Sequence, residues 1–304
     1  MSIRRLLMFT ALLGSAAQAA TYSVSAAFSP WAAQPYSVRA GVSDVLLGDS
    51  RLSLAVGNRA AELGVQRTQP LTAVGTLRLK LGGALVYGAE PGTRLSAAAD
   101  GSVGPVALSA SGQVWSAPAA ALDPLSVWQA SATDPSDSGW QADLSGRYRA
   151  SRNVILTLSG QLGQQSLASL SGEYRASAYS YRLGAQGGAG VLGVLAGFSY
   201  RADSFTLNAD ALVGRDFGGS LSLDAPVLVP LNAGQAIGLS AYLNYEPWRS
   251  VALPLRYGLD FDVPLGQAVD GHLNIGLRGG SGGAGLRAGY TFTPGLATPG
   301  VVSP

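Results

Sequence analysis

Residues that could do acid–base or metal chemistry are few in this 304-residue chain, and they are scattered. His272 is the single histidine, and cysteine is absent. A serine hydrolase needs a serine next to a histidine that a third group orients, and no spacing in the sequence brings such groups to His272. Asp260 and Asp262 share one face of an alternating segment with Asp270 nearby, but calcium takes six to eight oxygen ligands. We therefore expect no enzyme, no metal site and no cofactor, and interpret these aspartates as solvated or paired with arginine.

A tyrosine followed by an arginine recurs every 26 residues. The sequences are LSGRYRAS, LSGEYRAS and the looser AGFSYRAD, and the pairs are Tyr148–Arg149, Tyr174–Arg175 and Tyr200–Arg201. Neighbouring side chains of an extended strand point to opposite faces, so the three tyrosines share one face and the three arginines the other. The period corresponds to one hairpin of about 13 residues per strand with its turn, which places the pair on every second strand.

Alternation of apolar and polar residues dominates the chain after residue 20, which is typical of β-strands with one apolar face. Between Gly139 and Phe292 we count eleven strands with short turns, one of them the glycine-rich run 279–285, which lacks the lysine of a phosphate loop. Before this region about eight further segments alternate. Only 117–138, rich in Pro, Asp and Ser, interrupts the pattern. It predicts a long loop, with a short strand around Val127.

Composition indicates how so many strands are arranged. Only 12% of the residues are charged, 47% are hydrophobic and 41 are glycine, whereas soluble domains carry about 25% charged residues. An open sheet of this size would leave two long edges, and a barrel interior is filled by side chains only near eight strands. The sequence predicts an all-β fold, a single up-and-down antiparallel transmembrane β-barrel of about 18–20 strands, wet inside and apolar outside. A smaller barrel is the alternative if hairpins were counted twice.

The N-terminus has the three parts of a secretory signal peptide. Arg4 and Arg5 precede an apolar run at 6–13, and Ala17-Gln18-Ala19 forms a cleavage site. We expect a signal peptide at 1–19, the barrel at 20–292 and a periplasmic tail at 293–304. Of 20 Lys and Arg, 18 remain after Arg4 and Arg5 are removed, against 18 Asp and Glu. This balance argues against nucleic acid as a partner.

The segment GLRAGYTF at 285–292 is similar to the last-strand signal of bacterial outer-membrane β-barrel proteins, and the chain as a whole resembles the porin-like members of that class. Unlike most of them, the chain continues beyond Phe292. The resemblance implies a place in the bacterial outer membrane, with Phe292 at the periplasmic side. Membrane lipid and the outer-membrane assembly machinery are then the expected partners, together with a homo-oligomer or an envelope complex.

Counting back from Phe292 gives each strand a direction. Eleven strands separate Phe292 at the periplasmic side from the loop 117–138, which must therefore lie outside the cell. Because the exported chain starts in the periplasm, an odd number of strands must precede this loop. The count of eight must therefore be wrong by one, for a total of 18 or 20. The periplasmic rim should carry an aromatic belt made of Tyr148, Tyr174, Tyr179, Tyr181, Tyr200, Phe205, Tyr290 and Phe292.

The charged residues on the polar face should line the lumen, because arginine on the lipid face costs a few kcal/mol near the bilayer midplane. Two interpretations of them stay open: mutual neutralisation that stiffens the wall, or a basic stripe that favours anions. The predicted lumen-lining residues are Arg147, Arg149, Glu173, Arg175, Arg182, Arg201, Asp210, Arg256, Asp260, Asp262, Arg278 and Arg287.

The function expected from these features is a porin-like channel for passive diffusion of small hydrophilic solutes, since barrels of 16–18 strands leave an aqueous channel. A non-conducting structural or assembly barrel of a cell-envelope complex is the first alternative. A secreted soluble β-sheet protein is the second, and it should stay in solution without detergent.

Overall fold

The structure is a computed structural model that describes residues 20–71, 75–88, 90–130, 136–188, 190–231, 235–249, 253–265 and 270–294. The expected signal peptide at 1–19 and all but the first two residues of the expected tail at 293–304 lie outside these ranges. Within them, no helix is long and apolar enough to cross a membrane.

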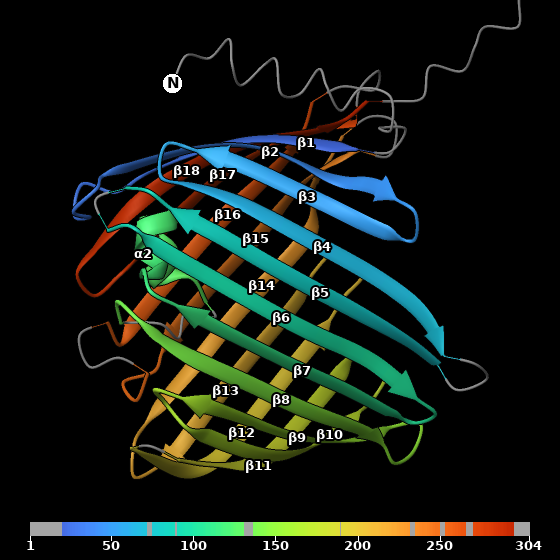
Figure 1. The fold of residues 1–304 in the computed structure, drawn as a ribbon. Coiled ribbons are helices and arrows are strands. Elements are labelled where there is room, and N and C mark those ends of the chain that lie inside the picture. The colour runs from blue at the N-terminus through green and yellow to red at the C-terminus, as the bar shows by residue number, and fades with distance from the viewer. Residues whose placement is uncertain are drawn as a thin grey trace, which may run out of the picture.

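Eighteen antiparallel strands form one closed barrel (Figure 1). Each strand pairs with its neighbours in sequence, and β1 closes the ring on β18 from Tyr22–Phe292 to Phe28–Leu286. The strands before the long loop are β1 (Thr21–Phe28), β2 (Tyr36–Leu47), β3 (Ser50–Gly57), β4 (Ala60–Leu71), β5 (Gly75–Val86), β6 (Gly92–Val103) and β7 (Val106–Trp115). Those after it are β8 (Gly139–Arg149), β9 (Val154–Gly163), β10 (Leu167–Arg175), β11 (Tyr179–Gly188), β12 (Val191–Arg201), β13 (Thr206–Gly214), β14 (Gly218–Pro230), β15 (Ala236–Tyr245), β16 (Leu255–Pro264), β17 (Asp270–Gly280) and β18 (Gly283–Thr293).

The predicted fold is confirmed, including the eleven strands from Gly139 onward and the odd number before the loop. Seven strands, not eight, precede the loop, because the segments on either side of Gly82–Gly83 form one strand, β5. Both glycines are paired within the sheet, Gly82 with Gly64 and Gly83 with Leu63. Two adjacent glycines mark a turn in many sequences, but here they lie in the middle of a strand.

The spacing of the tyrosine–arginine pairs reflects strand tilt. Tyr148 of β8 pairs with Leu156 of β9, and Leu156 pairs with Gly172 of β10 rather than with Tyr174. The register thus shifts by two residues per hairpin, as it does in a barrel whose strands tilt against the axis. Residues that recur every 26 positions therefore lie at the same level along the barrel axis, although they do not lie opposite one another in the strand pairing.

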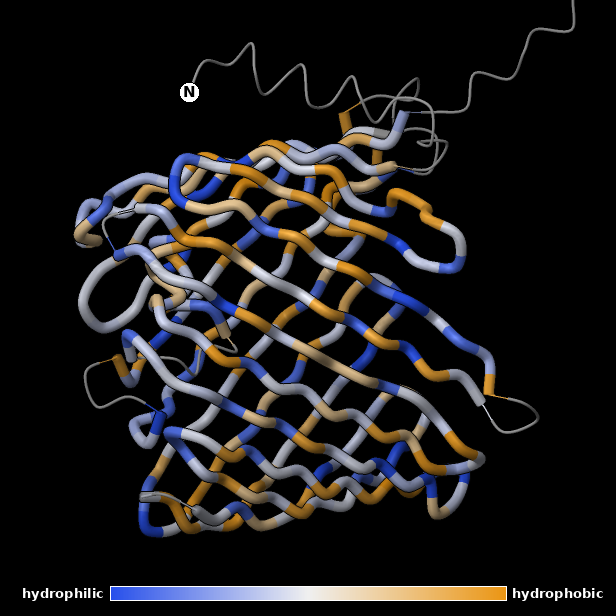
Figure 2. Tube along the Cα trace, in the orientation of Figure 1, coloured by the Kyte–Doolittle hydropathy of each residue, from blue (hydrophilic) through white to orange (hydrophobic). Residues whose placement is uncertain are grey.

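The two faces of the wall differ in polarity. Large apolar side chains point outward and are exposed, for example Leu183 at 66% and Leu192 at 67%. Figure 2 shows the resulting alternation of apolar and polar residues along the strands. Buried apolar residues form two small clusters. One, with Ala60, Val86 and Ala117, lies where the chain between β7 and β8 meets the strand ends, and the other consists of Ala20, Val42 and Val45.

We call residues 116–138 the inward loop; 116–130 and 136–138 are described. The loop lies at the end of the barrel opposite the one where β1 begins and β18 finishes, which we call the terminus end, and it folds into the barrel (Figure 1). It contains the helix α2 (Ala119–Leu122) and the 3-10 helix η1 (Ser126–Trp128). The expected strand around Val127 is wrong, because this segment has no neighbouring strand and closes its own i→i+3 bonds, from the Trp128 N–H to the Leu125 carbonyl at 3.1 Å and from Gln129 to Ser126 at 3.2 Å.

Candidate functional site at the loop end of the barrel

The inward loop begins against the strand ends beside it. Ala117 and Ala121 pack on Ala60 of β4 and Val86 of β5. Further along, Leu125 is only 1% exposed and lies over Gly285 of β18, where an added Cβ would overlap the Leu125 side chain. The first part of the loop therefore follows the inner side of the rim from β5 to β18.

Arg59, in the turn between β3 and β4, ties this part of the loop to the wall. Its side chain is 3% exposed. It donates to the carbonyls of Tyr36 and Ala120, each at 2.9 Å, and to the carbonyl of Gln34. Burial lowers the pKa of the Arg59 guanidinium, and the carboxylate of Asp123 in the loop opposes this effect. The guanidinium thus joins the loop to two carbonyls of the β1–β2 turn region.

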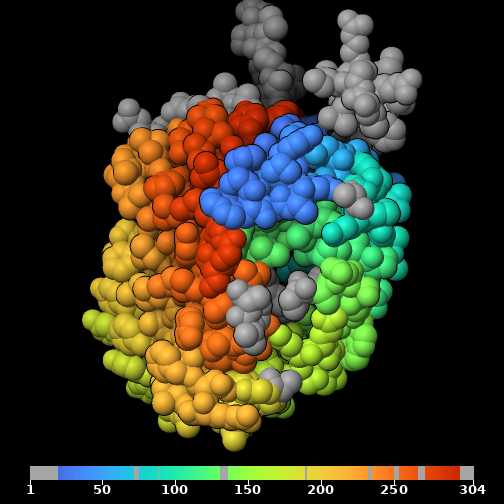
Figure 3. Space-filling view, turned by 90° about the vertical axis from the view of Figure 1, so that its left-hand side faces the viewer, coloured from blue at the N-terminus to red at the C-terminus, as the bar shows by residue number. Residues whose placement is uncertain are grey.

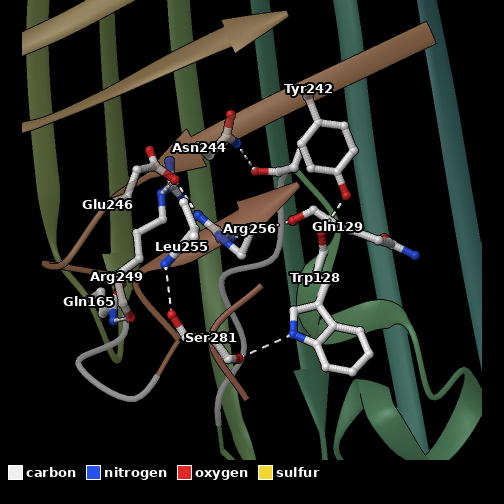
Figure 4. Close-up of polar contacts among 11 residues, drawn as sticks. Trp128, Gln129, Gln165, Tyr242, Asn244, Glu246, Arg249, Leu255, Arg256 and Ser281 are labelled. Carbon is white, nitrogen blue, oxygen red and sulfur yellow. Dashed lines mark hydrogen bonds and ion pairs between the residues drawn. The ribbon is translucent and has the colours of Figure 1, made fainter. Parts of the chain in front are cut away.

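The far part of the loop is held by β15, β16 and the β17–β18 turn (Figure 4). Its backbone carbonyls accept bonds from wall side chains: Trp128 from the Tyr242 hydroxyl, Gln129 from Arg256 at 3.4 Å and Ala130 from Asn244 at 3.1 Å. In return, the Trp128 indole donates to the carbonyl of Ser281 at 3.5 Å. Because wall side chains bind loop carbonyls, the attachment depends on the path of the loop backbone.

The loop returns to the side of the barrel from which it started. Ser136 accepts a bond from the Trp115 indole at the end of β7, at 3.2 Å, whereas Ala130 contacts β15. In a ring of eighteen strands, β7 and β15 are eight strands apart, nearly half the circumference. Figure 3 looks onto this end and shows the green loop residues inside the rim with a recess beside them. The loop therefore narrows this end of the barrel.

A second segment leans inward at the same end. We call residues 246–254 the rim loop; 246–249 and 253–254 are described. Arg249 binds Glu246 at 2.9 Å, and the Gln165 amide of the β9–β10 turn donates to the Arg249 carbonyl. Glu246 also pairs with Arg256, which is 3% exposed. Arg256 thus joins the rim loop and the inward loop at one point (Figure 4).

The inward loop borders one interior space, and the rim loop borders another. The first, of about 600 Å³, lies between the inward loop and strands β16–β18 and β1–β4, with Arg39, Glu62 and Arg287 in its lining. The other, of about 360 Å³, lies against β6–β11, and Arg249 of the rim loop reaches it. Serine, glutamine and asparagine side chains make up much of both walls. Such walls suit water and hydrogen-bonding solutes.

The structure brings most of the predicted interior residues into ion pairs. Glu173 binds Arg147 at 3.3 Å and Arg175 at 2.8 Å, and Asp210 binds Arg182 at 3.2 Å. Near the inward loop, Asp260 binds Arg287 at 3.2 Å and also Arg278, and Arg256 binds Glu246 as described above. Charge pairing therefore runs along much of the interior face.

The remaining predicted interior residues lie nearer the terminus end. Asp262 pairs with His272 at 3.0 Å, and Arg149 donates to the Arg152 carbonyl at 3.3 Å. Within the described ranges Arg201 has no ion pair, and no three histidine or carboxylate groups converge as metal ligands would. Arg149 and Arg201 are thus separate from the ion clusters.

The predicted aromatic residues gather at the terminus end of the outer face. Tyr148, Tyr174 and Tyr181 are 46–54% exposed. Ring contacts join Tyr179 to Tyr200 at 5.0 Å and Tyr200 to Phe205 at 5.7 Å between ring centroids. Tyr290 and Phe292 stack at 5.6 Å across the last strand. Phe198 and Tyr22, which belong to the same contacts, were missed although they occupy the same alternating positions.

Other residues of the site were also missed by sequence reasoning. Arg59 and Glu246 lie in turns, where alternation assigns no face. A signal was available in the loop itself, because AAALDPLSVW at 119–128 is far more apolar than a solvated loop needs to be. An apolar run inside an apparent loop indicates that the loop packs against something.

No family model and no curated protein matches the chain. Among solved structures, a chain described as "Asymmetric conductivity of engineered proteins" has a TM-score of 0.49 and 14% identity, covering 90% of this chain and 98% of that one. Two variants of the Rhodopseudomonas blastica porin, each 13% identical with the same coverage, have TM-scores of 0.49 and 0.48. We infer no activity from similarity at this level. The closed barrel of eighteen strands is established by the strand pairing alone.

Proposed function

We propose that the protein is a porin-like channel of the bacterial outer membrane that lets small hydrophilic solutes diffuse passively. One observation supports this most directly: a closed ring of eighteen strands carries apolar side chains outward and charged side chains inward. Closed barrels are one of only two architectures that can cross a lipid bilayer, because they leave no backbone group without a hydrogen bond.

The size of the ring favours conduction. Barrels of 16–18 strands are too wide for their own side chains to fill. In this protein the inward loop occupies part of one end and leaves a space of about 600 Å³ beside it, and a further space of about 360 Å³ lies beside Arg249 of the rim loop. A solute that passes would have to fit between loop and wall, which restricts the proposal to small molecules.

The proposal assigns roles to the residues described above. The aromatic residues at the terminus end would lie at the periplasmic membrane interface and anchor the barrel there. The interior arginines and carboxylates would line the lumen. Lipid is then the immediate partner, assembly would use the outer-membrane machinery, and oligomers or an envelope complex are compatible with the outer face.

A non-conducting structural barrel is the second candidate, and the attachment of the inward loop at both sides of the barrel favours it. A fixed loop that separates the two interior spaces from the far end would close the barrel.

Recording single-channel currents from the purified full-length protein in planar lipid bilayers tests both candidates. The channel proposal expects stepwise conductance from protein whose gel migration changes on heating, which identifies the folded barrel. Folded, inserted protein that passes no current would contradict the channel and support the structural barrel. Protein that stays soluble without detergent would contradict both.

A further inference from the structure

A row of uncharged polar side chains crosses the interior wall from β7 to β11. It consists of Ser109, Ser145, Ser159, Ser169 and Gln186, which stand opposite one another in the pairing of these five strands. The Ser109 hydroxyl lies 2.8 Å from that of Ser145. The Ser159 hydroxyl lies 2.6 Å from that of Ser169. We call these five residues the serine row.

The serine row can both donate and accept hydrogen bonds after its own bonds are made. A hydroxyl has one proton and two acceptor positions, and a side-chain amide has two protons and an acceptor oxygen. Each bonded pair of serines uses one of its two protons, so one proton and several acceptor positions remain for a bound molecule. A hydroxylated molecule carries the same mixture of donors and acceptors, whereas a carboxylate only accepts.

The serine row forms one side of the interior space of about 360 Å³. Ser111 and Gln161 add further polar groups to its lining, and Leu167 adds an apolar surface. Arg249 of the rim loop reaches the same space and is held by Glu246 at 2.9 Å (Figure 4). Pockets for small ligands have volumes of about 300–1,000 Å³. This space therefore suits one small molecule.

The charged groups that line this space are already bound within the protein. They are Asp100, Asp143 and Arg249. Asp100 pairs with Arg78 at 3.6 Å, and Asp143 accepts two bonds from the Gln141 amide at 3.0 and 2.8 Å. One arginine against two carboxylates gives an anion no net attraction. Within the described residues, no three carboxylates or histidines converge as metal ligands would. The groups left to bind a solute are therefore mainly the uncharged ones.

We propose that the serine row is a binding site for a neutral, hydroxyl-rich solute such as a monosaccharide or a polyol. This inference deepens the proposed channel function and rests on it for the way in which the solute reaches the row. The solute would replace water on the hydroxyls and amides, while its C–H groups lie against Leu167. Four strand spacings make the row roughly 19 Å long, so a sugar ring can bind at more than one place along it.

Saturation-transfer NMR detects binding to the full-length barrel whether or not the barrel conducts. The barrel is folded in a detergent without a sugar head group, and the probes are glucose, glucuronate and the ammonium form of glucosamine. We expect saturable binding of glucose. Glucuronate brings a carboxylate towards Asp100 and Asp143 and should bind about twofold more weakly, the factor for one unit charge at about 8 Å in a water-like dielectric. Glucosamine should bind no more tightly than glucose, because both carboxylates already have partners.

Substituting both Ser145 and Ser159 with alanine takes one hydroxyl from each bonded pair. We expect glucose to bind about tenfold more weakly, since about two hydrogen bonds to the solute are lost. The pair Ser145→Thr with Ser159→Thr keeps the hydroxyls and should keep most of the affinity. The matched control is Ser199→Ala with Ser222→Ala. These serines bond to Asn208 at 2.7 and 3.2 Å on the interior face and do not line the space, so their loss should leave glucose binding unchanged.

The outcomes separate this inference from the channel proposal. Glucose binding by an inserted barrel that passes no current contradicts the channel alone. A barrel that conducts without saturable glucose binding overturns the binding site alone, and so does tighter binding of either charged probe. An equal loss of binding in the Ser199 and Ser222 control also overturns it, because the serine row would then be no different from other hydroxyls of the lumen.

Discussion

At the scale of single residues, Arg59 shows how a buried cation can hold a loop without forming an ion pair. It satisfies three carbonyls from two separate parts of the chain. Alternation could predict that arginines such as Arg278 face inward, because they lie within strands. It could not predict the role of Arg59, which lies in a turn and binds backbone carbonyls. Every residue has a backbone carbonyl, so the sequence does not show which of them an arginine will bind.

Replacing Arg59 with alanine should loosen the inward loop. Each buried carbonyl left without a donor costs about 1–3 kcal/mol, so amide hydrogens of 117–130 should exchange faster in the folded barrel. Hydrogen exchange followed by mass spectrometry measures this. The matched control is Arg51→Ala, which breaks an exposed pair with Asp44 at 3.0 Å that is worth about 0–1 kcal/mol. Equal protection of the loop in both variants would contradict the anchoring role.

At the scale of elements, the strands and the inward loop differ in how far the sequence predicts them. Each strand of this barrel alternates with a period of two between an apolar outer face and a polar inner face. This pattern is local, and it predicted β8–β18. The loop folds inward because of contacts with β4, β15 and β18, which lie far away in sequence. Its position therefore cannot be predicted from a local sequence pattern.

The inward loop should limit the current if the barrel conducts. Substituting both Leu125 and Trp128 with alanine removes two large buried side chains of the loop, 1% and 4% exposed, and a buried leucine alone is worth about 2–5 kcal/mol. We expect larger and noisier single-channel conductance while the gel migration of the folded barrel still changes on heating. Trp140→Ala is the control, since Trp140 points outward at 53% exposure. Unchanged conductance of the double variant would mean that the loop does not set the width.

At the scale of the whole molecule, the ring explains the unusual composition. A soluble domain usually has about twice as many charged residues as the 12% of this chain. In this barrel the charged residues lie mainly on the inner face, and the outer face is apolar. The odd number of strands before the loop followed from placing both ends of the barrel domain at one side. The total stayed open between 18 and 20 because Gly82 and Gly83 resemble a turn.

The assignment of the outer and inner faces can be tested by introducing an arginine on each face of the same strand. Leu183→Arg places a guanidinium on the outer face, which costs about 2–4 kcal/mol near the bilayer midplane. Ser180→Arg on the same strand places it on the interior face. We expect the first variant to reach the membrane in a much smaller folded amount, measured by the heat-dependent gel shift of membrane fractions. Equal yields would show that the faces are assigned wrongly.

The attachment of the inward loop also has a consequence for the order of folding. The loop leaves the ribosome before β15–β18, yet the side chains that hold its far part, Tyr242, Asn244 and Arg256, belong to β15 and β16. Trp128 can therefore reach its final environment only when the last strands join the ring. In a variant with Trp128 as the sole tryptophan, the fluorescence change during refolding into detergent micelles should coincide with the slowest phase and mark closure.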